Sequence, residues 1–390
     1  MIRFKKATWM VAFFVFLGNF LYPDNSLSKL NFRALWVVRN SMINREEIDK
    51  ALQFAKNNKF NHVFLQVRGR GDALYNSQFA VRSQLIKNSK FDPLEYAIQK
   101  GHSLDLKVHA WINVLLAWTS NKLPNNDNHI IVSSPAWIDQ SFFNKRTLSG
   151  DLIFPKDKNV PKYLSPSHPG VRKHLMNILE EIITVYDLDG VHLDYIRYAD
   201  SDFGYNMSAR IMFEEQYGID PLRLVIDNDN DFSNKKDFES KKMLLAWGNY
   251  RRNAITNIIK SFNSLILNRR PECILSAAVK PNPNEAYNRF FQEWDLWLSE
   301  GLIDYAVPMN YAIDSQDFIY QINSIREKLS PKYWPGIIMG IAAYNQEVIE
   351  TRDKIRFSRT QGLSGVAIFS YDAHKENTKL FLPIGEELGK

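Results

Sequence analysis

The chain has a single cysteine, Cys273, among its 390 residues. One thiol excludes an internal disulfide and any metal site built from several cysteines. The shares of hydrophobic and charged residues, 45% and 24%, are those of an ordinary globular protein. A domain of this size can bury its own core without disulfides.

Several functional signatures are also missing. No Gly-x-Ser-x-Gly elbow is present, which argues against a serine hydrolase. Residues 67–72 contain Gly69 and Gly71 but open no helix, so a nucleotide site is poorly supported. No DNA- or RNA-binding motif occurs. The net charge of +6 includes three positive charges near the N-terminus, and the remaining +3 gives little support for a nucleic-acid partner.

The first 28 residues have the order of a secretory signal. Arg3, Lys5 and Lys6 precede an apolar run over residues 7–22, and polar residues follow. The run is short for a membrane span, which needs about 20 residues. A small-x-small cleavage site is not evident, so an uncleaved anchor that attaches the protein to a membrane is the alternative. We expect a periplasmic, cell-envelope or secreted protein, with residues 29–390 as its domain.

Strand-like and helix-like segments alternate through the rest of the chain. Strands are expected at residues 32–38, 62–68, 107–113, 191–194, 274–280, 305–311, 336–342 and 365–371. Helices are expected from residues 44 and 92 and over residues 169–186, 242–268, 294–300, 317–329 and 347–359. Eight such units predict an α/β protein with a (β/α)8 TIM-like barrel.

Two of the predicted connections are long, residues 115–168 and 198–241, and follow strands three and four. Both would rise from the face formed by the carboxyl ends of the strands and wall a cleft there. Residues 227–231 form an acidic run that invites a calcium hypothesis. An EF-hand would need glycine in place of Phe232 and glutamate in place of Phe238, so a solvated acidic loop is favoured.

The fourth strand carries the expected centre of the active site. Val191 and Leu193 point to one face, whereas His192 and Asp194 point to the other. Buried parallel strands are normally apolar on both faces. A polar face therefore indicates a strand that looks into a barrel near its mouth, where barrel enzymes hold their substrates. His192 is interpreted mainly as a lumen histidine that orients Asp194.

The ends of the other strands supply amide, guanidinium, carboxylate and aromatic groups. Rings can stack on the apolar face of a sugar while polar groups bind its hydroxyls, and Trp111 and Tyr311 are the best stacking candidates. The predicted substrate-binding residues are Arg68, Asp72, Trp111, Asn113, His192, Arg197, Lys280, Asn310, Tyr311, Tyr344 and Tyr371. Arg68 and Asp72 could equally form an ion pair that shapes a loop.

Glycoside hydrolysis usually requires two carboxyl groups across the scissile bond. Asp194 is the first. Glu293, after strand five, and Asp372, at the end of strand eight, are the candidates for the second, followed by Asp72. A mechanism with one carboxylate is the alternative, in which the acetamido group of the substrate attacks.

Together these segments resemble the glycosyl hydrolase-like family 10, barrel enzymes of bacterial envelopes. The resemblance rests on the order and spacing of residues 32–36, 64–68, 71–75, 109–113, 163–166, 168–172, 189–195, 213–214, 217–221, 297–298, 300–301, 304–305, 308, 311 and 365–371. It implies a TIM-like barrel that hydrolyses a glycan, with peptidoglycan as the best-supported substrate class and Asp194 as the catalytic residue.

Three positions depart from related patterns. The fourth strand also resembles the chitinase signature Asp-Gly-x-Asp-x-Asp-x-Glu, but His192 and Ile196 replace its second aspartate and its glutamate. The chitinase acid is therefore absent. The proline that often follows the asparagine of strand three in the family is Val114 here.

We therefore expect an exported glycoside hydrolase that acts on an envelope or extracellular polysaccharide, with peptidoglycan glycan strands first. Asp194 would be its general acid or nucleophile. It requires no cofactor or metal, and no obligate protein partner is evident. One alternative is a non-catalytic glycan-binding barrel. Another is a metal-dependent polysaccharide deacetylase, for which His109, His192 and Asp194 are the conceivable zinc ligands.

Overall fold

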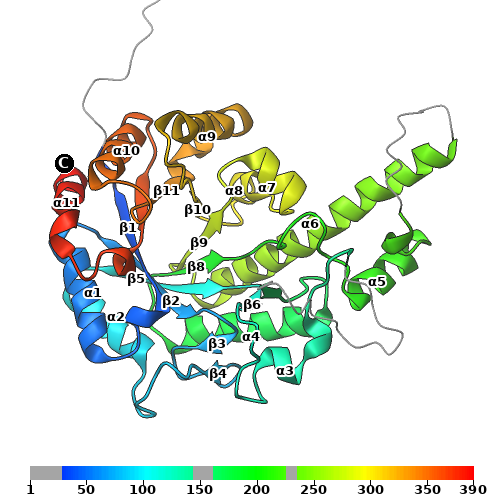
Figure 1. Ribbon diagram of the computed structural model, residues 1–390, viewed down its shortest axis with the longest axis horizontal. Helices are drawn as coiled ribbons and strands as arrows, with labels where there is room; N and C mark the ends of the chain where they lie inside the picture. Colours follow the sequence, from blue (N-terminus) through cyan, green and yellow to red (C-terminus); the bar gives the residue numbers. More distant parts are fainter. Residues whose placement is uncertain (1–28, 144–160, 225–234) are drawn as a thin grey trace, which may run out of the picture.

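Eight parallel strands form a barrel in the computed structural model, which describes residues 29–143, 161–224 and 235–390 (Figure 1). The strands are β1 (Phe32–Val37), β2 (His62–Arg68), β5 (Lys107–Asn113), β8 (Gly190–Asp194), β9 (Ile274–Val279), β10 (Tyr305–Pro308), β11 (Ile338–Ala342) and β12 (Gly365–Phe369). They pair in the order β10-β9-β8-β5-β2-β1-β12-β11. Parallel bridges at Ala306–Ile337 and Met309–Gly340 close the circle between β10 and β11. The predicted (β/α)8 barrel is confirmed.

Helices surround the barrel, with α1 and α2 beside β1 and β2 (Figure 1). They are α1 (Arg45–Asn57), α2 (Pro93–Ser103), α4 (Pro169–Val185), α6 (Lys235–Arg269), α7 (Pro283–Arg289), α8 (Trp294–Ser299), α9 (Ser315–Lys328), α10 (Val348–Thr360) and α11 (Leu382–Leu388). The side chains of Asn44 and Asp92 accept backbone N–H groups at the starts of α1 and α2, as N-caps do. In the described ranges no helix combines the length and apolarity that a membrane crossing requires.

The lumen of the barrel is filled by stacked rings. Phe64 lies flat against His192, with ring centres 4.0 Å apart. The indole N–H of Trp36 donates to Nε2 of His192 at 3.1 Å, and Nδ1 of His192 lies 2.9 Å from Oγ of Ser276. Burial lowers the pKa of His192 to about 3, so the imidazole is neutral. Because an indole only donates, Trp36 leaves the proton on Nδ1, which donates to Ser276.

The two long connections contain structure of their own. In the first, β6 (Leu116–Trp118) pairs antiparallel with β7 (Lys162–Tyr163), and α3 (Ile130–Ser133) follows β6. The second contains α5 (Met207–Tyr217), and α6 begins at residue 235 rather than at the predicted residue 242. Residues 235–241 are mostly charged or polar and carry little apolar periodicity, which explains the late prediction. Residues 1–28 and the acidic run 227–231 lie outside the described residues.

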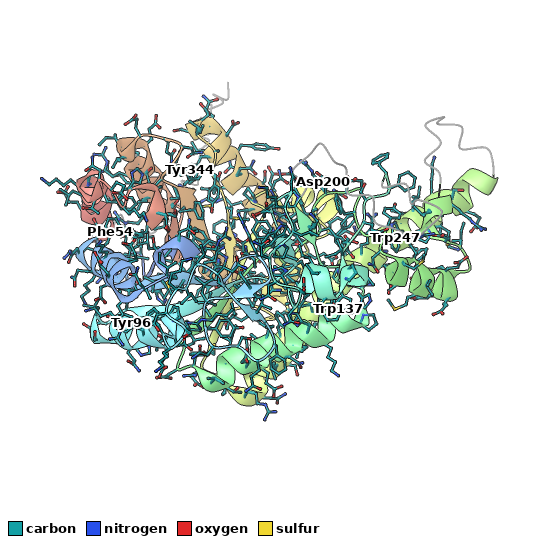
Figure 2. The ribbon with its side chains drawn as sticks, turned by 60° about the horizontal axis from the view of Figure 1, so that its bottom comes forward. Phe54, Tyr96, Trp137, Asp200, Trp247 and Tyr344 are labelled. Atoms are coloured by element: carbon teal, nitrogen blue, oxygen red, sulfur yellow. The ribbon has the colours of Figure 1, made fainter. Side chains whose placement is uncertain are left out.

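Helices α5 and α6 form an arm that projects from the barrel (Figure 1). Phe213 of α5 packs edge-on against Trp247 of α6, with ring centres 4.9 Å apart. Figure 2 shows Trp247 on this arm and Tyr344 over the barrel. The loop after β2 forms β3 (Asp72–Ala73), which pairs with both β2 and β4 (Val81–Arg82).

Gly365 of β12 is paired with Phe32 of β1 and lies close to its backbone. A Cβ atom there would lie 2.0 Å from the backbone oxygen of Phe32. Since a paired strand cannot rotate away as a side chain can, Gly365→Ala should lower the free energy of unfolding by about 2–3 kcal/mol. Gly248→Ala, in α6, meets only the end of the Arg252 side chain at 3.3 Å and should be neutral or stabilising. Urea denaturation followed by circular dichroism checks both; equal stability of the two variants would contradict the strand contact.

Candidate active site

A pocket of about 310 Å³ opens where the carboxyl ends of the strands surround the lumen. This volume is at the lower end of the range for small-molecule sites. The lining side chains come from strands around the barrel and from the loops that follow them. They are Trp36, Val38, Arg39, Gln66, Trp111, Asn113, Leu116, Thr119, Asp194, Tyr195, Arg197, Ala278, Met309, Tyr311 and Phe369.

Asp194 is the only carboxylate among these lining residues. It is the last residue of β8, and its exposed fraction is 7%. Burial raises the pKa of Asp194 to about 6, although the charge of Arg197 and the N–H of Tyr195 act in the opposite direction. A carboxyl with this pKa can give up and take back a proton near neutral pH.

The residue that follows Asp194 has an unusual backbone conformation. Tyr195 has a φ of 52°, in the left-handed region that non-glycine residues rarely adopt. This turn directs the backbone N–H of Tyr195 onto Oδ1 of Asp194 at 2.6 Å. Strain of this kind costs about 1–3 kcal/mol and is frequent at functional sites. The turn therefore fixes one oxygen of Asp194.

Amide and indole groups form the next part of the pocket. The indole N–H of Trp111 donates to Oδ1 of Asn113 at 3.0 Å. Nδ2 of Asn113 donates to the backbone oxygen of Gly69 at 2.9 Å. Oε1 of Gln66 accepts the backbone N–H of Arg39 at 3.2 Å. These bonds hold Trp111 and Asn113 in one orientation toward the pocket before a ligand arrives.

Two cations flank Asp194. The guanidinium of Arg197 lies 4.9 Å from the ring centre of Tyr195, and Nζ of Lys280 lies 4.3 Å from the ring centre of Phe290. Burial lowers the pKa of Lys280, as does the neighbouring charge of Arg197. The positive field of both side chains favours the ionised form of Asp194 and keeps its pKa from rising further.

Aromatic rings form the opposite wall. Tyr311 is stacked on Phe369, with ring centres 5.7 Å apart, and Tyr344 stands edge-on to Phe369 at 5.8 Å. Tyr344 is 53% exposed and extends this wall toward solvent. Flat, partly exposed rings beside a carboxyl suit the apolar face of a sugar.

Neither candidate for a second carboxylate lines this pocket. Glu293 accepts a hydrogen bond from Thr256 at 3.3 Å and lies 3.8 Å from Nε of Arg252, between α6 and α8. Asp372 accepts the backbone N–H of Val38 and the hydroxyl of Ser41, both at 2.7 Å. Asp372 thus holds the loop after β1, and both its oxygens are occupied.

Other predicted binding residues also have structural contacts. Arg68 is fully buried and donates to the backbone oxygens of Asn113 and Val114. Nδ2 of Asn310 donates to the backbone oxygen of Phe318 at 2.9 Å. None of the predicted residues Arg68, Asn310, His192, Lys280, Tyr344 and Tyr371 is among those that line the pocket.

Tyr371 packs edge-on against Phe54 of α1 at 5.2 Å. Asp72 lines a neighbouring cavity, and no ion pair joins it to Arg68 within the described ranges. His109, considered above as a zinc ligand, lies in the lumen with Nε2 2.8 Å from Nδ1 of His62. The described residues include no group of three or more His, Cys, Asp or Glu side chains placed to hold a metal ion.

Among the lining residues that were not predicted from the sequence are Trp36, Arg39, Tyr195 and Phe369. Trp36 and Arg39 come from the end of β1. The rule that polar and aromatic residues at strand ends reach the mouth would have found them, had it been applied to the first strand. The backbone turn at Tyr195 has no sequence signal, because tyrosine does not favour it.

Comparison with known proteins identifies the family of this chain. A family model described as Glycosyl hydrolase-like 10 matches residues 31–355. The chain belongs to this family. It is 24% identical to the glycosyl hydrolase YngK of Bacillus subtilis, over 76% of this chain and 58% of that protein. It is also 24% identical to the glycosyl hydrolase DigH of Escherichia coli K12, over 73% of this chain and 62% of that protein. The chain thus spans about three fifths of these relatives.

Solved structures agree with the barrel. The glycoside hydrolase domain of PgaB (BpsB) from Bordetella bronchiseptica superposes with a TM-score of 0.67 at 13% identity, over 90% of this chain and 96% of that one. A β-galactosidase from Bacillus circulans superposes with a TM-score of 0.64 at 10% identity, over 93% of this chain and 56% of that one. At such low identities the likeness concerns the fold alone. Both of the matched structures are named as glycosidases.

The raised pKa of Asp194 predicts a stability change that needs no substrate. The unfolded carboxyl ionises near pH 4, but the folded one ionises near pH 6, so wild type loses stability as the pH rises through this window. The stability of Asp194→Asn relative to wild type should therefore increase by about 2–3 kcal/mol between pH 4 and pH 8. Urea denaturation at both pH values measures this.

Asp220→Asn is the matched control with the opposite sign. The Arg210 guanidinium holds the pKa of Asp220 below its usual value. That carboxylate therefore adds stability above its unfolded pKa and loses it in acid. Asp220→Asn should be less stable than wild type at pH 8 and approach it in acid. A stability difference between Asp194→Asn and wild type that does not change with pH would contradict the buried, protonated state.

Proposed function

We propose that this protein is a glycoside hydrolase in which Asp194 acts as general acid and then as general base. The observation that carries the proposal is a buried carboxyl with a pKa of about 6 at the end of β8, in a pocket walled by rings and fixed amides. Membership in a glycosyl hydrolase-like family and relatives named as glycosyl hydrolases support it.

The proposed reaction uses one carboxyl from the protein. Protonated Asp194 donates its proton to the glycosidic oxygen as the bond from that oxygen to C1 breaks. Because no second carboxylate lines the pocket among the described residues, the carbonyl oxygen of the substrate's own 2-acetamido group attacks C1 and forms a positively charged oxazolinium ring that keeps its N–H proton. The ionised Asp194 then takes a proton from water as that water attacks C1 and reopens the ring.

Other residues position the sugar and Asp194. The N–H of Tyr195 fixes one oxygen of the carboxyl, and Arg197 stabilises its ionised form. Trp111 and Tyr311 offer stacking surfaces, and Asn113 offers polar atoms whose positions are set by β5. A mechanism with attack by the acetamido group requires an N-acetylated sugar, and we propose peptidoglycan glycan strands as the substrate. The basic and apolar order of residues 1–28 supports export to the envelope.

The pH dependence of turnover tests the role of Asp194. Since the reaction starts with the protonated carboxyl, kcat/KM should fall as the pH rises through about 6. Asp194→Asn should lower kcat by about 10² to 10⁴ on glycan strands, scored as new reducing ends by mass spectrometry. Glu293→Gln should retain activity within about twofold, because its side chain packs between α6 and α8. A large loss of activity in Glu293→Gln would instead support a mechanism with two carboxylates.

The acetamido group gives a second test. Glycan strands whose amino sugars have been de-N-acetylated should bind but yield no products, because the attacking oxygen is gone. Re-acetylation of the same material with acetic anhydride should restore cleavage. Equal cleavage of both forms would mean that a protein group or water attacks C1. Binding of N-acetylated strands by wild type without any product would favour a non-catalytic glycan-binding barrel.

A further inference from the structure

A second cavity of about 300 Å³ lies beside the candidate active site. Arg39 lines both cavities, and β6 contributes to both, through Leu116 to the first and Trp118 to the second. The second cavity is formed mainly by the loop after β2, with β3 and β4, and by the loop after β6. Its polar and aromatic lining includes Arg39, Arg70, Asp72, Arg82, Trp118 and His129.

The charge in this cavity is unbalanced. Three guanidinium groups face one carboxylate, which leaves two net positive charges. Burial lowers the pKa of His129, so this side chain adds no charge at neutral pH. No carboxylate among the described residues lies within 4.0 Å of the guanidinium of Arg39 or Arg70. Asp72 instead accepts the backbone N–H of Arg70 at 3.0 Å.

Arg39 and Arg70 are both partly buried, and neither forms an ion pair with a carboxylate of the described residues. Burial and the charge of Arg70 lower the pKa of Arg39, whereas the carboxylate of Asp72 acts in the opposite direction. Nε of Arg70 is buried without a hydrogen-bond partner. Buried or half-buried charges cost free energy unless an anion or hydrogen bonds compensate them. Arg82 differs, because it already binds Asn76 and backbone oxygens of its own loop.

The loop holds these two guanidinium groups in place. The side chain of Arg39 lies against Gly69, where an added Cβ would be 2.6 Å from Nη1. Gly71 has a φ of 77°, a conformation that suits glycine, and it turns the chain directly after Arg70. The guanidinium of Arg70 lies over Trp118, 5.7 Å from a ring centre. The two cations are therefore presented next to a partly exposed aromatic ring.

We propose that this second cavity is a subsite that binds a carboxylate carried by a sugar of the glycan, next to the sugar held at Asp194. Trp118 would contact the sugar ring, while Arg39 and Arg70 would bind the carboxylate through charge-assisted hydrogen bonds. The inference rests on the proposed function in that it takes the ligand to be a glycan. Two sources supply such a group: a uronic acid, or the lactyl ether of a muramic acid freed of its stem peptide.

Binding to the Asp194→Asn variant separates this inference from turnover. Titration calorimetry would compare chitotetraose, which is neutral, with a hyaluronan tetrasaccharide and with stem-peptide-free peptidoglycan tetrasaccharide. At least one carboxylated ligand should bind about tenfold more tightly than chitotetraose, and raising the salt concentration should weaken that preference. The ligand that shows the preference names the source of the carboxylate. Equal affinity of all three ligands would overturn the proposal.

Arg70→Gln is the decisive variant, because Arg70 lines the second cavity but not the first. Added to Asp194→Asn, it should weaken binding of the preferred ligand about tenfold and that of chitotetraose less than twofold. Arg326→Gln is the matched control: its guanidinium lies over Trp334, 5.0 Å from the ring centre, and it lines neither cavity. Equal losses for charged and neutral ligands in Arg70→Gln would overturn the subsite.

The two proposals can fail separately. If wild type yields no products while Arg70→Gln abolishes the preference for the carboxylated ligand, the hydrolase fails and the subsite stands. If wild type cleaves glycan strands but no ligand preference depends on Arg70, the subsite fails and the hydrolase stands.

Discussion

The removal of one carboxyl group from water is the constraint on which the site depends. Asp194 ends a strand that is buried on both faces, and burial is the largest influence on its pKa. Burial alone would raise the pKa of this carboxyl further. Arg197, Lys280 and the N–H of Tyr195 offset part of this cost and bring the pKa back to about 6. The chemistry of the pocket follows from this balance rather than from one contact.

Contacts in the lumen below Asp194 hold β8 in the position that buries the carboxyl. His192 faces the lumen two residues before Asp194, and its two nitrogens are bound by Trp36 and Ser276 while Phe64 covers its ring. These contacts come from β1, β2 and β9, so three strands hold β8 in position. A neutral, fully bonded imidazole in this place excludes a charge that would otherwise compete with Arg197 for the carboxylate.

Sequence reasoning recovered what is encoded locally. The eight strands and the helix starts at residues 44 and 92 follow from periodicity and from start signals. The place of Asp194 at the mouth of the barrel follows from the rule that barrels hold ligands at strand ends. The roles of Glu293 and Asp372 could not be read in this way, because the partners decide them. The oxygens of Asp372 are occupied by a loop more than 330 residues away, and no local pattern reports such a contact. The role of Arg39 could likewise not be read from a local pattern, because its neighbours come from the loop after β2.

The two cavities differ in their distribution of charge. The first cavity has one carboxyl with cations beside it, and the second has guanidinium groups in excess. Arg39 lines both cavities, and both Tyr195 and Arg70 act electrostatically on its pKa. If both proposals hold, a neutral N-acetylated sugar would bind in the first cavity and an anionic sugar in the second. A polymer that alternates the two kinds of residue could therefore occupy both cavities in only one register, which would decide the bond presented to Asp194.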